Sequence, residues 1–157
     1  MTGVQTCALP ISDFPDQRKL LLEDFEGRIG DAVEEIVRYS TPVIFMRRNL
    51  TQDYEMNGHT YKAGDKVLLF YNSANRDVAV FDDPDTFDIT REHNPHLGFG
   101  GPGAHFCLGA NLARREITVM LRELFTRLPV RAEGEPDRLL SGFINGYKRL
   151  PCTFTKP

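Results

Sequence analysis

The sequence contains no tryptophan, only three cysteines and no long run of apolar residues. Because a helix that spans a bilayer needs about 20 consecutive apolar residues, we expect no membrane span. Cys7, Cys107 and Cys152 are odd in number and widely spaced, which argues against a disulfide framework and makes a cytoplasmic location the default expectation. The formal net charge of −3 lacks the basic excess of a typical nucleic-acid-binding protein, so no nucleic-acid partner is expected.

The composition is that of an ordinary globular protein, with 41% hydrophobic and 26% charged residues in a chain of 157. A chain of this length can bury one hydrophobic core and form a single domain. Residues 1–12 contain a short apolar stretch with no basic segment before it. They therefore lack the pattern of a signal peptide.

Hydrophobic periodicity and turn signals predict a chain with more helix than strand. Asp13 and Asp31 are suited to cap the first two helices, because an aspartate at this position accepts hydrogen bonds from unpaired N–H groups. Asn57-Gly58 is a strong hairpin turn, and residues 82–98, with two prolines and scattered polar residues, predict an irregular meander. The expected helices cover residues 15 to 27 or 30, 31–39 and 108–128, and the expected strands cover 53–56, 59–61, 66–70, 143–144 and 152–154.

The most informative stretch is Gly100-Gly101-Pro102-Gly103-Ala104-His105-Phe106-Cys107-Leu108-Gly109. It places one cysteine at the end of a glycine-rich loop and at the start of a predicted helix. The unpaired N–H groups and the dipole of a helix start favour negative charge, and the thiolate is the form of cysteine that binds metal. The glycines leave room for a flat, bulky group against the backbone. The loop is therefore predicted to hold a cofactor whose metal takes Cys107 as ligand.

Phe99 to Gly109, followed by Ala110-Asn111-Leu112-Ala113-Arg114, resembles the haem-binding loop and helix of the cytochrome P450 superfamily, the haem-thiolate monooxygenases. Upstream, Glu35-Ile36-Val37-Arg38 resembles the Glu-x-x-Arg motif of the same family. Three segments between them resemble family segments in register: Arg48-x-x-x-x-Asp53-x-Glu55-x-x-Gly58, Ala74-Asn75-Arg76-Asp77 and Asp83-Pro84-Asp85-x-Phe87-Asp88-x-x-Arg91. The resemblance covers about residues 14 to 157. Residues 1–13 are expected to be a non-family segment, an artefact of a truncated or chimeric reading frame.

The resemblance implies an α+β fold, mainly α with a small antiparallel β-sheet, as in the C-terminal part of the cytochrome P450 fold. It implies haem b (iron protoporphyrin) as the cofactor and Cys107 as the axial ligand of the iron. Arg48 and His105 match positions that hold the haem propionates, and a guanidinium suits a carboxylate because it can donate two parallel hydrogen bonds. Arg47 is the neighbour with which Arg48 is most easily confused. The implied cofactor-binding residues are Cys107, His105, Arg48, Phe99, Gly100, Gly103 and Gly109.

Phe99 is expected to pack against the porphyrin or the sulfur and to shield both from water. Glu35 and Arg38 lie three residues apart, on one face of a helix. The resemblance implies that they join Arg91 of the meander and brace the loop beneath the haem, which is a structural role. No catalytic residue is assigned, because the family's proton-relay helix does not fall within the match.

The implied activity is hydroxylation of an unactivated C–H bond in an apolar substrate, with O2 and two electrons from a ferredoxin-type donor. Phe99 lies one residue further from the cysteine than in the commonest family spacing. The expanded form resembles a bacterial subgroup that acts on sterol side chains, methyl-branched lipids and terpenes. Residues 41–46 and 141–146 match segments that line the substrate pocket. The arginines of the last helix are either a docking surface for the donor or a solvated helix face: Arg114, Arg115, Arg122 and Arg127.

Two other functions fit single motifs. Gly98-x-Gly100-x-x-Gly103 has the spacing of a dinucleotide-binding fingerprint but lacks the buried strand that must precede it, so a Rossmann enzyme is rejected. Four side chains could in principle bind zinc, although the glycine loop would then have no purpose: His93, His96, His105 and Cys107. A non-catalytic haem- or zinc-binding module stays open as the alternative.

The match corresponds to roughly the final third of a full-length family member. The helix that relays protons to bound oxygen in the family, and most of the distal pocket, fall outside it. We therefore expect this chain by itself to bind haem poorly and not to turn over substrate.

Overall fold

The computed structural model of the protein describes residues 10–127 and 130–154. The helices that position the site are α2 (Pro15–Glu23), α3 (Phe25–Ser40), α4 (Tyr71–Ala74) and α5 (Ala110–Arg127). The strands are β1 (Phe45–Asn49), β2 (Tyr54–Met56), β3 (His59–Tyr61), β4 (Lys66–Phe70), β5 (Val130–Ala132), β6 (Asp137–Arg138), β7 (Tyr147–Arg149) and β8 (Cys152–Phe154). The expectations for residues 1–9, including Cys7, lie outside the described residues.

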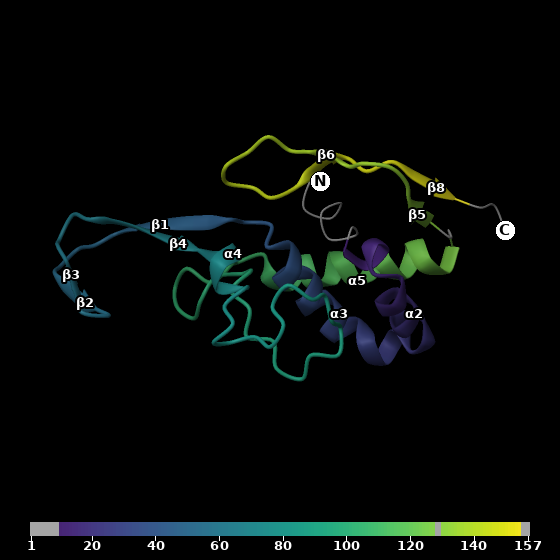
Figure 1. Ribbon diagram of the computed structural model, residues 1–157, viewed down its shortest axis with the longest axis horizontal. Coiled ribbons are helices and arrows are strands. Elements are labelled where there is room, and N and C mark those ends of the chain that lie inside the picture. Colours follow the sequence, from purple (N-terminus) through teal and green to yellow (C-terminus); the bar gives the residue numbers. More distant parts are fainter. Residues whose placement is uncertain (1–9, 128–129, 155–157) are drawn as a thin grey trace.

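The helices α2, α3 and α5 lie together and form the helical body of the molecule (Figure 1). α3 contacts both α5 and α2, and β1 and β4 form a ribbon that leads away from the helices to the β2–β3 hairpin. Strands β5 to β8 run along the other side of α5 from α2 and α3. The prediction of a mainly helical α+β fold is confirmed, but within residues 10–127 and 130–154 the β part consists of four two-stranded antiparallel ladders and not of one small sheet.

Helices α2 and α3 meet at Asp24, and the helix boundaries expected from the sequence in this region are wrong. α3 begins at Phe25, because the Asp24 side chain accepts a hydrogen bond from the N–H of Gly27 at 3.0 Å. Gly27 and Gly30 thus lie inside α3 and do not end α2. Asp13 does not cap α2 either, since the capping position is Phe14.

The end of α3 follows the sequence more closely. Thr41 adopts the left-handed conformation with φ of 37° and donates its N–H to the carbonyl of Val37 at 3.0 Å, a common way to close a helix. Pro42 then prevents the helix from continuing, as expected.

The hydrophobic core lies between α3, α5 and the end of the meander. α3 buries apolar residues at helical spacing, and α5 contributes Ile117 and Leu121. Phe87 from the meander completes an aromatic cluster with Phe14 and Tyr39. Ile11, from the segment set apart from the family match, is also buried in this core.

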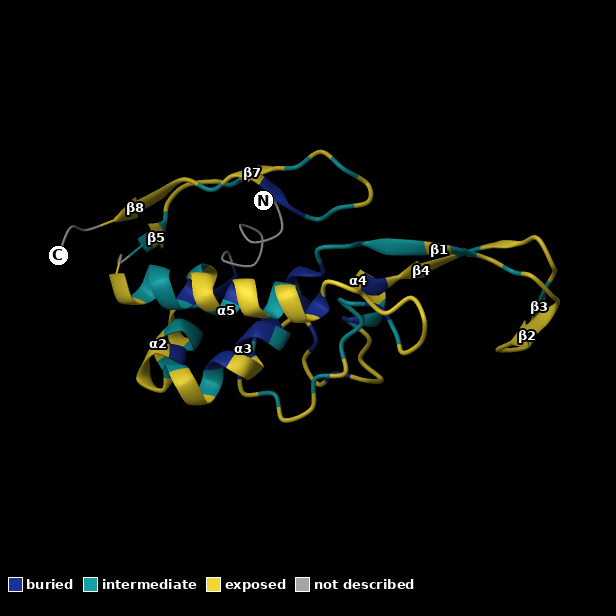
Figure 2. Ribbon diagram, turned by 180° about the vertical axis from the view of Figure 1, so that it is seen from behind, coloured by how far each residue is buried: buried dark blue, intermediate teal, exposed yellow. Residues whose placement is uncertain are grey.

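The long helix α5 has exposed residues along much of its length (Figure 2). Ile117 and Leu121 are buried on its inner face, but Met120 is exposed. Leu112 of the same helix and Leu108 just before it are exposed as well. Apolar residues on the outer face of a helix indicate a surface that another part of a larger protein can cover.

The β elements show where local signals suffice. Asn57 and Gly58 both have positive φ, 53° and 74°, as a two-residue hairpin turn requires, and β4 and β8 are found where they were expected. β1, β5, β6 and β7 were not expected. In place of the strand predicted at 143–144 there is a single bridge between Val43 and Ile144.

Candidate cofactor site

Cys107 ends the loop of residues 99–107, just before α5, and the residue is exposed. Its backbone N–H donates to the carbonyl of Phe99 at 2.9 Å, which closes the loop of residues 99–107 at its base. The N–H groups of Leu108 and Gly109 donate to no acceptor within the described part of the chain. The structure therefore holds an accessible sulfur beside unpaired donors at a helix start, the setting that favours a thiolate.

Glycines shape the loop in two ways. Gly100 and Gly103 have φ of +86° and +131°, conformations that residues with a side chain rarely adopt. Gly98 is needed for packing, because a Cβ atom there would lie 2.5 Å from Cγ1 of Val37 on α3. A Cβ atom on Gly109 would lie 3.9 Å from the Cys107 sulfur, an ordinary contact. The loop is thus held against α3 while its outer side stays free of side-chain bulk.

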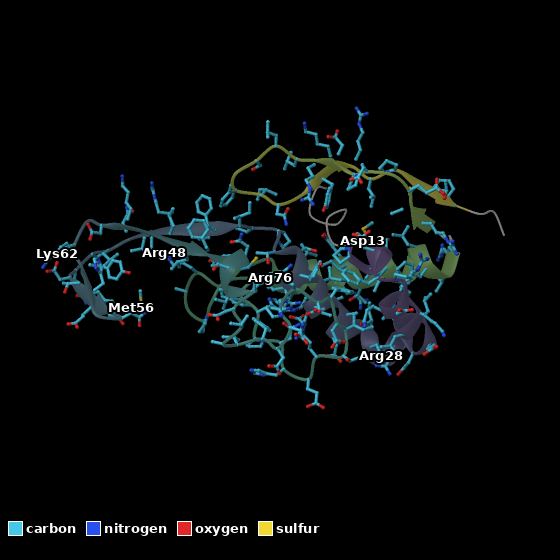
Figure 3. All side chains as sticks on the ribbon, viewed as in Figure 1. Asp13, Arg28, Arg48, Met56, Lys62 and Arg76 are labelled. Carbon is cyan, nitrogen blue, oxygen red and sulfur yellow. The ribbon has the colours of Figure 1, made fainter. Side chains whose placement is uncertain are left out.

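An open hollow of about 820 Å³ beside the loop brings two predicted site residues together. Arg48 from β1 and His105 from the loop both line it. Apolar side chains of β4 line it as well. Figure 3 shows Arg48 on the ribbon of β1 and β4, away from the helical body. Arg47 is exposed and does not line the hollow, so the geometry favours Arg48 over its neighbour.

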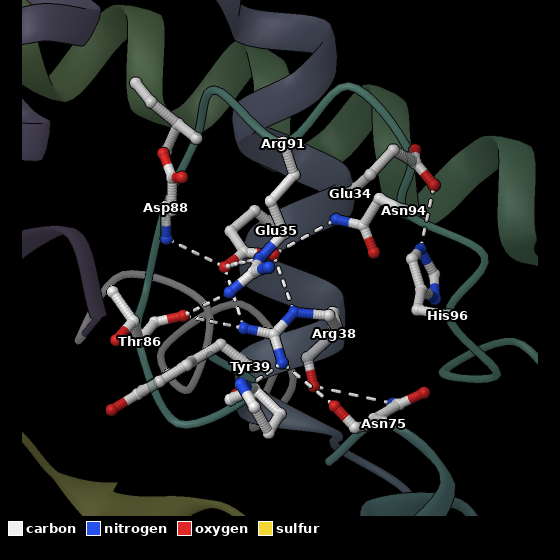
Figure 4. Close-up of polar contacts among 12 residues, drawn as sticks. Glu34, Glu35, Arg38, Tyr39, Asn75, Thr86, Asp88, Arg91, Asn94 and His96 are labelled. Carbon is white, nitrogen blue, oxygen red and sulfur yellow. Dashed lines mark hydrogen bonds and ion pairs between the residues drawn. The ribbon is translucent and has the colours of Figure 1, made fainter. Parts of the chain in front are cut away.

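Glu35 and Arg38 form a buried ion pair on α3 (Figure 4). Their side chains are 1% and 0% exposed. The Nε and Nη2 groups of Arg38 donate to the two carboxylate oxygens at 2.7 and 2.8 Å. Such a pair is stable in a buried site only when its remaining donors and acceptors are also satisfied.

The meander and the segment before it supply the remaining hydrogen-bond partners of the Glu35–Arg38 pair. Arg38 also donates to three backbone carbonyls, those of Asn75, Pro84 and Thr86, at 2.7 to 2.9 Å. Arg91 donates to Glu35 Oε1 at 3.3 Å and to the carbonyls of Asp82 and Asp83. The structure thus brings Glu35, Arg38 and Arg91 together, and their contacts hold the irregular segment 75–91 on α3.

Two asparagines take part that had no individual role in the sequence analysis. Asn94 donates to Glu35 Oε2 at 3.0 Å. Asn75 is fully buried, and its side chain joins Thr41 at the end of α3 to the backbone N–H of Leu97, just before the loop. Asn75 lay in a matched segment, but its partners are 22 and 34 residues away in the chain, so no local pattern could reveal them.

A second ion-pair network lies beside the first. Arg114 on α5 donates through Nε and Nη2 to the two oxygens of Glu34 at 2.5 and 2.8 Å. His96 Nε2 lies 2.9 Å from Glu34 Oε2, and its Nδ1 accepts the N–H of Gly98. Burial raises the pKa of Glu34, but the hydrogen bonds from Arg114 and His96 and the positive charge of Arg114 outweigh it and bring the pKa down to about 2.

These contacts bear on the arginines of α5. Arg114 pairs with Glu34, Arg122 with Glu26 and Arg127 with Glu123. A helix face whose arginines are neutralised within the chain offers less attraction to an acidic partner than the sequence suggested. Arg115 is exposed and forms no ion pair among the residues that the structure describes.

The zinc alternative finds no geometric support. Because His96 Nδ1 accepts a hydrogen bond from an N–H group, its Nε2 carries a hydrogen and donates to Glu34. Both ring nitrogens are therefore occupied. Within residues 10–127 and 130–154, no group of three or more His, Cys, Asp or Glu side chains is placed to hold a metal ion.

The two segments matched to the substrate pocket lie side by side. The N–H of Ile44 donates to the carbonyl of Phe143 at 3.0 Å, and the N–H of Asn145 donates to that of Pro42 at 2.9 Å. The rings of Phe45 and Phe143 are 5.8 Å apart. The segments thus form a joint apolar surface.

Comparison with known proteins identifies the family. The cytochrome P450 family model matches residues 30–147. The methyl-branched lipid omega-hydroxylase of Mycobacterium tuberculosis (strain H37Rv) is 59% identical over 148 residues, which are 94% of this chain and 35% of that protein. The steroid C26-monooxygenase of Rhodococcus jostii (strain RHA1) is 47% identical over 143 residues, 90% of this chain and 30% of that protein.

Solved structures agree. A cytochrome P450 of Mycobacterium marinum in complex with pseudoionone has a TM-score of 0.89 and 44% identity, over 98% of this chain and 36% of that one. P450BioI in complex with an acyl carrier protein has a TM-score of 0.92 and 37% identity, over 97% and 40%. The chain belongs to the cytochrome P450 family, and it spans about a third of the length of the curated relatives it matches.

Membership of this family implies a haem cofactor, and the residues present fit one. Cys107 is exposed, a Cβ atom on Gly103 would meet open space, and Arg48 and His105 both line the adjoining hollow. None of the helices in the described part of the chain combines the length and the hydrophobicity that crossing a membrane requires.

Replacing Arg38 with alanine should lower the free energy of unfolding by roughly 3–5 kcal/mol, because it leaves the buried Glu35 carboxylate without its main partner. Arg127→Ala, which removes an exposed pair with Glu123, should cost less than about 1 kcal/mol. Urea denaturation of both variants measures the difference. An equal decrease in the free energy of unfolding for both variants would show that the buried ion pair stabilises the fold no more than the exposed one.

The depressed pKa of Glu34 predicts a pH dependence of stability. The folded pKa of about 2 lies below the ordinary value of 4.5, so the ionised carboxylate stabilises the fold fully above pH 4.5, and this stabilisation disappears as the pH falls towards 2. The gap in unfolding free energy between the unmodified chain and Glu34→Gln should therefore be constant from pH 7 to 5 and shrink below that. A gap unchanged at pH 2.5 in a urea series contradicts the prediction.

Proposed function

We propose that residues 14–157 are the C-terminal haem-binding part of a haem-thiolate monooxygenase that hydroxylates an unactivated C–H bond of an apolar substrate. The observation that carries this proposal is the exposed Cys107 just before α5, at the end of a loop closed on Phe99. When bound, the haem supplies oxygen activation, and thiolate ligation favours cleavage of the O–O bond.

The chain's own residues would hold and orient haem b. Cys107 would be the axial ligand, with the N–H groups of Leu108 and Gly109 close by to moderate the charge on sulfur. Arg48 and His105 would hold the propionates from the hollow that they share. Phe99 would shield the sulfur from water, and the Glu35–Arg38–Arg91 cluster would keep the meander in place beneath the loop.

A lipid, sterol or terpene is the substrate class that we propose. Two relatives are named for a methyl-branched lipid and a steroid, and the expanded Phe99–Cys107 spacing supports the same group. The paired segments around Ile44 and Phe143 offer an apolar wall. A ferredoxin-type protein would deliver the electrons, and the cytoplasmic location expected from the cysteines stays a prediction.

By itself the 157-residue chain leaves apolar side chains near the loop in water, among them Leu69, Phe70 and Leu108. Haem bound there would be open to solvent. We therefore expect weak haem binding and no substrate turnover by this chain alone.

The reduced, carbon-monoxide-bound absorption spectrum after haem titration tests the ligand. We expect a red-shifted Soret band that is lost in Cys107→Ser and kept in Cys152→Ser, which removes another exposed thiol. Haem, iron and zinc contents measured on the same samples identify what is bound. One equivalent of zinc without haem would refute the proposal.

The propionate assignment is tested by a pair of neighbours. Arg48→Gln should weaken haem binding by about tenfold, as expected for the loss of one charge-assisted hydrogen-bonding group. Arg47→Gln, on the exposed side of β1, should change the apparent dissociation constant by less than about twofold. Equal effects of the two variants would mean that only net charge matters.

A further inference from the structure

We propose that Glu34 and Arg114 are positioning residues for Cys107, acting through Phe99. This inference rests on the proposed function, because it concerns how the sulfur is presented to haem iron. Neither residue touches the sulfur in the contacts described above. Each acts through the next member of a chain that runs from α3 to α5 and then to the loop.

The first link fixes the guanidinium of Arg114. Glu34 accepts hydrogen bonds from its Nε and Nη2, so the guanidinium and the carboxylate are paired in parallel. His96, with its side chain 3% exposed, donates to the same carboxylate and holds it from the other side. The carboxylate therefore has little freedom to release Arg114.

The second link is the contact between Arg114 and Phe99. The Arg114 Cζ atom lies 4.5 Å from the centre of the Phe99 ring, within the range of a cation–π contact. The His96 ring lies 5.8 Å from the same ring. Phe99 thus contacts two members of the Glu34 network.

The third link reaches the cysteine. The carbonyl of Phe99 accepts the backbone N–H of Cys107 at 2.9 Å. A shift of Phe99 would therefore move or break the bond that sets where Cys107 leaves the loop.

The chain contains a matched pair that lacks the last link. Arg122 lies eight residues after Arg114 on α5, and Glu26 lies eight residues before Glu34 on α3. Arg122 donates to Glu26 at 2.8 Å, and its guanidinium lies 5.6 Å from the ring of Phe25. This second pair joins the same two helices with the same side-chain types. Phe25 belongs to α3 and not to the loop, so its loss should leave Cys107 unaffected.

Hydrogen exchange of the Cys107 amide, followed by NMR without haem, measures the link directly. Arg114→Gln and Glu34→Gln should accelerate exchange of this amide by about tenfold, because local opening becomes easier when a charge-assisted contact is lost. Arg122→Gln and Glu26→Gln should change it by less than about twofold. Unchanged exchange at Ile36 and Ile117 in the core would show that the fold is intact.

A spectroscopic readout separates positioning from general stability. In haem-titrated samples, Arg114→Gln should increase the share of the reduced carbon-monoxide complex that lacks the red-shifted Soret band, while Arg122→Gln should not. Arg114→Lys should fall between, because an ammonium can pair with Glu34 but cannot lie flat on the Phe99 ring.

The outcomes distinguish the two proposals. Equal acceleration by all four glutamine variants, or none by Arg114→Gln and Glu34→Gln, overturns the positioning role whether or not haem binds. Selective acceleration with no haem signal in the unmodified chain supports the link from Arg114 to Cys107 and counts against the proposed function of this chain.

Discussion

The architecture depends on the complete hydrogen bonding of one buried guanidinium. The Arg38 side chain has no exposed surface, and among the described residues its hydrogen bonds go to Glu35 and to the carbonyls of Asn75, Pro84 and Thr86. An irregular segment has no ladder or helix of its own in which to satisfy its carbonyls. Arg38 supplies donors for three of them at once, so this segment acquires a defined path, and the loop that carries Cys107 is connected to the end of that path.

What the sequence could predict depended on how local each signal is. The Asn57-Gly58 hairpin, the end of α3 at Pro42 and the long α5 each follow from a few adjacent residues, and the structure has them. The start of α3 was predicted wrongly because Asp24 and Asp31 are both competent caps, and only the packing of Phe25 and Ile29 against the rest of the core distinguishes them. β1 has no alternating pattern and exists because β4 lies beside it.

The residues of the candidate site also divide into those with a local sequence signal and those whose partners are distant in the chain. Cys107, the glycines and the Glu35–Arg38 pair were visible because their spacing is short and characteristic. Asn75, Asn94 and the Glu34–His96–Arg114 network were not, because each joins segments that are between 22 and 80 residues apart. Arg114 is instructive, because on the sequence it is one of several arginines on a helix face, and only its partner distinguishes it from Arg115.

The hydrogen bond between the Cys107 amide and the Phe99 carbonyl has a consequence for loop evolution. It joins the two ends of the loop directly, so the residues between them form a closed excursion that projects outward. Gly101 and Gly103 have nothing within contact range of their outer sides, and this excursion can gain a residue without displacing either end. The additional residue between Phe99 and Cys107 can therefore be accommodated within this excursion while the hydrogen bond at its base is kept.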